Sequence, residues 1–372
     1  SSRMLESFKE APHIGGILYE GNTEATEKFF FMMREIFKER KKQLGGGNFR
    51  QYQQDGKKGI PAIVIVIDQY GVFREKTDGK YDSQMLEIAK EGNGIGVYLI
   101  VSAGGVGNDE VPMKLKDSLK NSVCLQMNDK YSYKELMHAE KMDIYPKTGV
   151  KGRGLWNRQG EALEFQTALC LVEHNDYERG RQIKKLCLEM ADQWKGERAR
   201  TIPMIPEQPV YSEFSKLPEV KRILEDDRHL PLGYDVKSAA VWSLDLSRMY
   251  CYLVSGRKGT GKKNFLRMAI RMASNKGGEL YVFGKERGIL EKTAKEVNAV
   301  YYSEQDDLTE FCLGFKPELI RRNKKKNEMA DAGFVDDELY EKMNDEKKIF
   351  IFIEDLPTFA ETLYHPEEGK PA

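Results

Sequence analysis

A glycine-rich loop with two terminal lysines is the clearest chemical motif of the sequence. Its eight residues are Gly256, Arg257, Lys258, Gly259, Thr260, Gly261, Lys262 and Lys263. An apolar stretch precedes the loop and an amphipathic stretch follows it, which is the strand, loop and helix order of phosphate-binding loops. Glycines let backbone N–H groups point at phosphate oxygens, and the helix N-terminus adds its dipole. The loop therefore predicts an ATP site in which Lys262 reaches the β- and γ-phosphates.

Lys263 departs from the pattern of such loops, which place Ser or Thr at this position. The hydroxyl of that residue normally ligates Mg²⁺, whereas an ammonium group cannot ligate Mg²⁺ and repels it. We therefore expect ATP to bind weakly or without metal, and Mg²⁺ to bind weakly or not at all. Whether ATP is hydrolysed stays open.

Two apolar runs end in residues that could act on a bound nucleotide. One run ends in Glu354 and Asp355, and the other in Asp68 and Gln69. In each pair the first residue stands where an acid holds Mg²⁺, and the second where an acid polarises the attacking water. Asp68 and Glu354 are thus candidate Mg²⁺ ligands, and all four are candidate catalytic positions of a degenerate site.

Both pairs depart from an efficient catalytic site. Gln69 carries an amide, which is not basic and cannot accept a proton from water. Glu354 and Asp355 stand in the reverse of the usual order, so metal and water would both be displaced. A displacement of about 1 Å can cost ~100-fold in rate. These features predict slow or absent hydrolysis at both sites.

The elements that would position these residues alternate between strand and helix patterns. Uninterrupted apolar runs, typical of parallel strands buried on both faces, occupy 61–67, 96–102 and 347–353. Further strands are predicted at 121–127, 239–246, 250–255 and 279–283, with a hairpin over 152–172. Helices are predicted at 24–44, 83–91, 111–119, 132–137, 176–195, 264–275 and 308–326. This alternation predicts an α/β fold with mainly parallel sheets.

A proline-rich segment divides the chain. Four prolines fall within residues 196–218, which we expect to be an extended, structureless linker. It separates residues 1–195 from 219–372. At roughly 150 residues per domain, the length of 372 residues predicts two or three domains.

The composition excludes several classes of protein. Hydrophobic residues make up 40%, enough for real cores, so global disorder is excluded. Lys and Arg total 59, as do Asp and Glu, so a generally basic nucleic-acid binder is not indicated. Basic runs at 38–42 and 321–326 are more simply interpreted as solvated helix faces. No apolar run is long enough to span a bilayer, and no signal peptide is visible. The five scattered cysteines indicate reduced thiols and no zinc site.

Taken together, these runs resemble the FtsK/SpoIIIE family of P-loop motor ATPases over nearly the whole chain. The resemblance is carried by residues 11–16, 63–69, 88–100, 152–155, 164–166, 230–235, 244–246, 256–263 and 349–355. Tandem modules joined by a Pro-rich linker are most similar to the EssC/EccC ATPases of type VII secretion systems. The resemblance implies tandem RecA-like P-loop NTPase modules. Residues 1–195 would be the C-terminal part of a degenerate module, and residues 219–372 the N-terminal part of the next.

The resemblance also implies a function, a location and partners. We expect a cytoplasmic portion of a membrane-anchored protein that docks secreted proteins through helical export signals and regulates their translocation. Neighbouring ATPase modules are expected partners, within a homo-hexamer in the full assembly. The sequence departs from the family pattern at Gln69, Asn93, Ala103 to Gly105, Cys124, Gln126 and Lys263. Two alternatives stay open: a DNA translocase, disfavoured by the zero net charge and eroded catalytic residues, and a nucleotide-free assembly module.

Overall fold

The computed structural model describes residues 5–371, apart from 139–141, 159–160, 248–250, 286–287, 344–345, 363 and 366–369. The chain forms two compact units, Ser1–Met204 and Ile205–Ala372. The division falls inside the proline-rich segment 196–218. We describe each unit by itself, and the assignment of the two units to successive modules stays a prediction.

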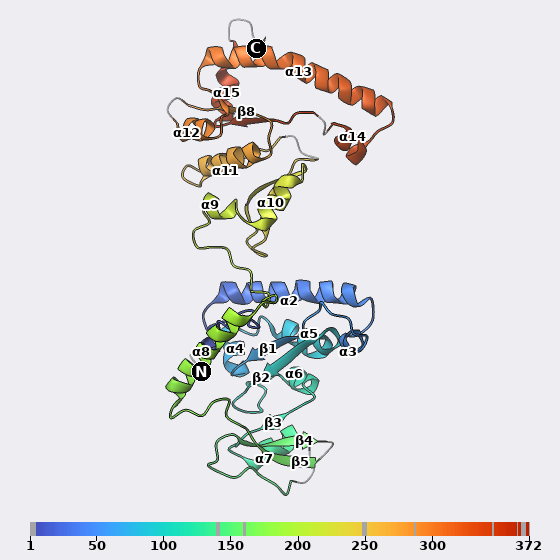
Figure 1. The fold of residues 1–372 in the computed structure, drawn as a ribbon, viewed down its shortest axis with the longest axis vertical. Coiled ribbons are helices and arrows are strands. Elements are labelled where there is room, and N and C mark those ends of the chain that lie inside the picture. Colours follow the sequence, from blue (N-terminus) through green and yellow to red (C-terminus); the bar gives the residue numbers. More distant parts are fainter. Residues whose placement is uncertain are drawn as a thin grey trace. The chain divides into compact units, whose positions relative to one another are not determined.

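Unit 1 is built around a pair of parallel strands. Its elements are α2 (Thr23–Leu44), α3 (Phe49–Gln54), β1 (Ile63–Ile67), α4 (Tyr70–Lys76), α5 (Asp82–Glu91), the 3₁₀ helix η1 (Gly92–Ile95), β2 (Val97–Val101), α6 (Met113–Ser118), β3 (Val123–Cys124), α7 (Lys130–Met137), β4 (Arg153–Arg158), β5 (Glu161–Gln166) and α8 (Asp176–Gln193). β1 and β2 pair in parallel, with Ile67 opposite Val101. β3, β4 and β5 form an antiparallel sheet. Figure 1 shows α2 and α5 beside the β1–β2 pair.

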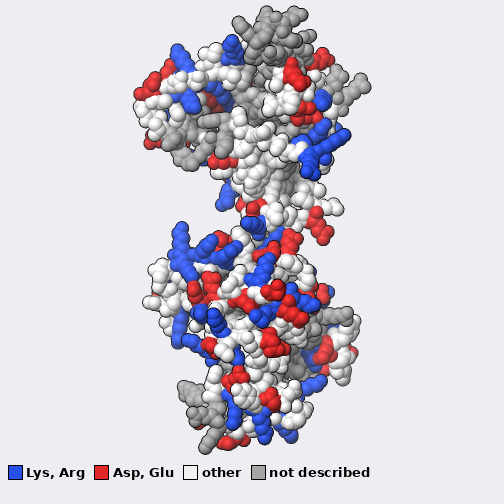
Figure 2. Space-filling view, turned by 180° about the vertical axis from the view of Figure 1, so that it is seen from behind, with Lys and Arg blue, Asp and Glu red and all other residues white. Residues whose placement is uncertain are grey.

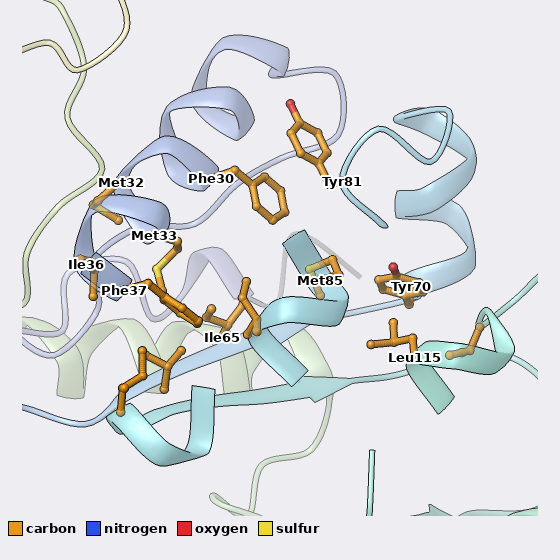
Figure 3. Packing of buried hydrophobic residues seen from close by; sticks show 14 residues of the cluster. Phe30, Met32, Met33, Ile36, Phe37, Ile65, Tyr70, Tyr81, Met85 and Leu115 are labelled. Carbon is orange, nitrogen blue, oxygen red and sulfur yellow. The ribbon is translucent and has the colours of Figure 1, made fainter. Parts of the chain in front are cut away.

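The core of unit 1 lies on one face of the β1–β2 pair. Phe30 and Phe37 of α2, Met85 of α5 and Ile65 of β1 are all buried in one cluster (Figure 3). The other face differs from the sequence prediction. Its side chains, Val64, Val66, Tyr98 and Ile100, are between 38% and 57% exposed. The prediction that these two strands are buried on both faces is therefore wrong, because no described element covers this second face.

Arg40 holds α2 against the start of both strands. Its side chain is buried, and one guanidinium nitrogen donates to the carbonyl oxygens of Ile95 at 2.9 Å and Gly96 at 3.0 Å. The second terminal nitrogen of the guanidinium donates to the carbonyl of Pro61 at 2.6 Å. Burial lowers the pKa of Arg40. A residue of the predicted basic run 38–42 thus has a structural role.

Unit 2 contains a three-stranded parallel sheet. Its elements are α9 (Tyr211–Phe214), α10 (Pro218–Glu225), β6 (His229–Tyr234), β7 (Val241–Asp245), α11 (Lys262–Asn275), β8 (Glu279–Phe283), α12 (Ile289–Glu296), β9 (Val300–Tyr302), α13 (Gln305–Asp331), α14 (Asp336–Met343), β10 (Ile349–Ile353), α15 (Leu356–Thr362), β11 (Tyr364–His365) and β12 (Lys370–Pro371). The strand order is β10-β8-β9, and both pairings are parallel. β6 and β7 form an antiparallel pair.

Helices cover both faces of this sheet (Figure 1). On one face, Phe311 of α13 packs on the rings of Tyr281 and Phe283 of β8, with centroid distances of 4.8 and 5.0 Å. On the other face, α11 and α12 contribute Ile270 and Leu290 to the buried core. The predicted α/β class with parallel central sheets is confirmed.

Several predicted elements differ in the structure. The linker is shorter than 196–218, because the N–H groups of Ala199 and Ile202 donate to carbonyls of unit 1, and Phe214 of α9 is buried in unit 2. The predicted strand 121–127 shrinks to β3, and β6 was not predicted. Residues 251–255 form no strand, since no described strand pairs with them. Tyr250, the first residue of that prediction, lies outside the described residues. Among the described helices, none is long and apolar enough to cross a membrane.

Candidate nucleotide site

The glycine-rich loop closes on itself around Lys262. Its ammonium nitrogen, Nζ, donates to the carbonyl of Gly256 and to that of Arg257, the latter at 2.9 Å. Gly259 and Gly261 have φ values of 86° and 96°, which residues with a Cβ rarely adopt. The glycines at these two positions therefore allow the backbone to turn into α11. The lysine that would contact phosphates lies at the centre of the turn.

The start of α11 has no side-chain cap, because its N-cap residue is Gly261. The first N–H groups of a helix have no partner within that helix, and they carry the positive end of its dipole. α11 begins at Lys262, as the predicted helix following a phosphate-binding loop should. The loop and this helix start form a surface suited to an anionic group.

Lys263, the departure noted in the sequence, contacts the acid at the end of β10. Its Nζ lies 2.5 Å from Oε1 of Glu354. The lysine side chain is 59% exposed, whereas the Glu354 side chain is 5% exposed. The other carboxylate oxygen of Glu354 accepts a hydrogen bond from the backbone N–H of Lys285 at 3.1 Å. The buried carboxylate therefore has a cation on one oxygen and a backbone donor on the other.

Residues at the end of β8 enclose this carboxylate, and sequence reasoning missed them. A Cβ at Gly284 would lie 2.9 Å from Oε2 of Glu354, so a larger residue there would displace this carboxylate. The Tyr301 hydroxyl donates to the carbonyl of Lys285 at 2.5 Å. Burial, followed by the charge of Glu354, raises the pKa of Tyr301 to about 12. The signal was available: β8 and β10 were both predicted, and parallel neighbours end at the same edge of a sheet.

Asp355, unlike Glu354, contacts the start of the helix that directly follows it. It precedes α15, and its carboxylate oxygen Oδ1 accepts a weak hydrogen bond from the N–H of Thr358 at 3.4 Å. This backbone contact lowers the pKa of Asp355. The ammonium of Lys285 lies 3.5 Å from the other oxygen. An acid that receives the N–H three residues ahead is the usual N-cap of a helix.

The residues of this site differ from the usual ligands of Mg²⁺. A hydroxyl ligand is missing at position 263, and the ammonium that replaces it is paired with Glu354. Mg²⁺ requires oxygen ligands in near-octahedral geometry, and a cation in contact with its carboxylate opposes it. Within the part of the chain that the structure describes, no group of three or more His, Cys, Asp and Glu residues could hold a metal.

The candidate residues of unit 1 meet at the ends of β1 and β2. Oδ1 of Asp68 accepts a hydrogen bond from the hydroxyl of Ser102 at 2.7 Å. The same hydroxyl accepts one from the N–H of Gln69 at 2.8 Å. Gln69 has a φ of 56°, in the left-handed region. Ser102 was missed as a site residue in the sequence, although it is the last residue of the predicted partner strand 96–102. The structure thus brings Asp68 and Gln69 together with a serine, but the described residues of unit 1 contain no loop with the glycine and lysine pattern of 256–263.

Comparison with known proteins gives three relevant similarities. The type VII secretion system protein EssC of Staphylococcus aureus (strain MRSA252) is 23% identical over 380 residues, which cover 96% of this chain and 25% of EssC. The chain therefore spans about a quarter of this curated relative. Two solved structures also align: ATPases 2 and 3 of EssC from Geobacillus thermodenitrificans, and ATPases 2 and 3 of Thermomonospora curvata EccC in complex with a signal sequence peptide. No family model matches the chain.

The structural similarities show the fold. The Geobacillus EssC structure aligns with a TM-score of 0.70 at 16% identity, covering 94% of this chain and 70% of that one. The Thermomonospora EccC structure aligns with a TM-score of 0.51 at 17% identity, covering 97% and 70%. The chain therefore has the RecA-like α/β fold of these structures. The chain is homologous to the ATPase modules of the type VII secretion proteins EssC and EccC.

Proposed function

We propose that this chain is a tandem ATPase segment of a type VII secretion motor, which docks secreted proteins and regulates their translocation. The observation that carries the proposal is the similarity to EssC over 96% of the chain, which includes both units. The EccC structure with a bound signal sequence peptide supports docking as the task of such modules. Neighbouring ATPase modules are the other proposed partners, in a hexameric assembly.

The chemistry of the two candidate sites favours a docking role over rapid hydrolysis. In unit 1, the amide of Gln69 stands where a general base is needed, and losing such a base typically costs ~10²–10⁴-fold in rate. In unit 2, Lys263 pairs with Glu354 at the position expected for a metal ligand. The turn around Lys262 supports binding of a nucleotide phosphate in unit 2, with hydrolysis slow or absent.

The charges of the chain argue against the DNA translocase alternative. In the run 38–42, Lys38 pairs with Glu35 and Lys41 with Glu91, while Arg40 is buried. In the run 321–326, Arg321, Arg322, Lys324 and Lys325 pair with Glu318, Glu328 or Glu346. Figure 2 shows positive and negative side chains interspersed on the face that it displays. DNA binding relies on basic side chains that neutralise phosphates, and here neighbouring acids neutralise many of them.

The five cysteines support a cytoplasmic location for this segment. All five are free thiols, and Cys124 and Cys187 are buried. Burial raises the pKa of the Cys124 thiol to about 11, which keeps it protonated and unreactive. Free thiols are usual where the compartment is reducing. We propose that a membrane anchor lies elsewhere in the complete protein, as the resemblance implies.

A peptide titration tests the docking function. A fluorescent C-terminal helical peptide of a cognate secreted protein is titrated with the full chain at ~0.15 M salt, near physiological ionic strength. We expect micromolar affinity, ~8 kcal/mol. A peptide with the same composition in scrambled order is the control, and duplex DNA is titrated in parallel. Tight DNA binding without peptide binding would instead support the translocase, and binding of neither ligand would leave the assembly module as the better interpretation.

A further inference from the structure

The ion pair between Lys263 and Glu354 joins two parts of the candidate site that a divalent cation would otherwise join. Lys263 lies in the first turn of α11, next to the phosphate-binding turn, and Glu354 lies at the end of β10. The pair spans 91 positions in the sequence, so it depends on the folded arrangement of unit 2. The two charged groups are in direct contact, with 2.5 Å between Nζ and Oε1, so the ion pair is also a charge-assisted hydrogen bond.

This contact differs from an ordinary surface salt bridge. Exposed pairs contribute little because water solvates both charges well. The Glu354 side chain is 95% buried, enclosed by Gly284 and by the backbone of Lys285. A buried carboxylate without a positive partner is strongly unfavourable, so this position requires a cation. Lys263 provides it from within the chain.

We propose that Lys263 serves as the resident cation of this site, in place of a divalent metal ion, so that a nucleotide phosphate binds there without metal. The proposal rests on the nucleotide binding proposed above. A metal ion would have to displace the ammonium from Glu354, and the ammonium would remain nearby as a repelling charge. Site occupancy should therefore be insensitive to Mg²⁺.

Nucleotide titration with and without metal tests this proposal. ATP binding to the full chain is measured in millimolar Mg²⁺ and in EDTA, for the wild type and for Lys263→Thr, which restores a hydroxyl. The wild-type affinities in the two buffers should agree within ~2-fold. The Lys263→Thr variant should bind ATP at least ~10-fold more tightly with Mg²⁺ than in EDTA, a free-energy difference of ~1.4 kcal/mol. Lys263→Arg, which keeps the cation, should behave as the wild type. A wild-type affinity that rises tenfold or more with Mg²⁺ would overturn the proposal.

Lys285→Met is the matched control. It removes an ammonium of equal charge from the same edge of the sheet, one that contacts Asp355 at 3.5 Å, and the backbone N–H that binds Glu354 remains. The ratio of affinities with and without Mg²⁺ should stay near one in this variant. A gain of metal dependence here equal to that of Lys263→Thr would show that general charge, and not the pair with Glu354, excludes the metal.

Thermal unfolding without nucleotide keeps the test independent of the proposed nucleotide binding. Lys263→Thr leaves Glu354 without its cation, so the unfolding temperature of unit 2 should fall by ~5 °C or more. Millimolar Mg²⁺ should recover part of this loss in the variant and leave the wild type unchanged. If neither protein binds ATP, nucleotide binding fails as a function while this response still supports the resident cation. A variant that melts like the wild type and ignores Mg²⁺ overturns it.

Discussion

Replacing Arg40 by alanine should destabilise unit 1 strongly, because its guanidinium joins α2 to the start of both central strands. The substitution removes the guanidinium donor from the carbonyl oxygens of Ile95, Gly96 and Pro61. The Gly96 oxygen keeps the N–H of Ile63 as a donor at 2.9 Å. A buried acceptor left unpaired costs about 1–3 kcal/mol. The Pro61 carbonyl is partly exposed and can regain water, and removing the buried charge returns part of the loss. We therefore expect the free energy of unfolding to fall by about 3 kcal/mol.

Thermal and urea unfolding of the full chain measure this effect. A loss of about 3 kcal/mol in a unit of this size corresponds to roughly 6–12 °C in the unfolding temperature. Amide exchange should report the same loss in β1 and β2, and much less in unit 2. Lys38→Ala is the matched control, because Lys38 lies on the same helix and makes only an exposed contact with Glu35. A loss below ~1 kcal/mol for Arg40→Ala would refute the reasoning, since the three hydrogen bonds would then contribute no more than an exposed pair.

Two further perturbations have outcomes set by the structure. Gly96→Ala places a methyl group 2.6 Å from the ring of Phe49, at a residue whose φ is 75°. The free energy of unfolding of unit 1, measured with urea, should therefore fall by several kcal/mol. A variant as stable as the wild type would contradict the described turn. Hydrogen bonds, first from Arg321, lower the pKa of Glu346 from 4.5 to about 2. The folded-state pKa lies below the unfolded one, so this contribution to stability is present above pH 4.5 and is lost as pH falls toward 2. The unfolding temperature of unit 2 should decline over that range, and less steeply in Glu346→Gln.

The uncovered face of the β1–β2 pair shows a limit of reading burial from sequence. Runs of β-branched residues identified both strands to within two residues, because such residues favour extended backbone. The same runs suggested burial on both faces, but burial is a property of the neighbours. No described element packs over Val64 and Val66, so they remain exposed although their residue types are apolar.

The sequence alone predicted most of the local elements and suggested the type of site. The spaced glycines of the loop, the amphipathic helix after it and the acids at strand ends are short-range features, and each was visible in the sequence before any contact was known. The two ends of α2 follow the same local rules, because Asn22 caps its first turn and Gly45 ends it in a left-handed conformation.

Only the tertiary structure decided what the unusual residues do. Lys263 could be interpreted in the sequence as a missing metal ligand, but its contact with Glu354 requires α11 to pack beside β10. Ser102 joins Asp68 and Gln69 only because β1 and β2 pair in register. Likewise, residues 251–255 have strand-forming side chains but no described pairing partner. Partners far apart in sequence are chosen by the packing of whole elements, and local residue preferences carry no information on that choice.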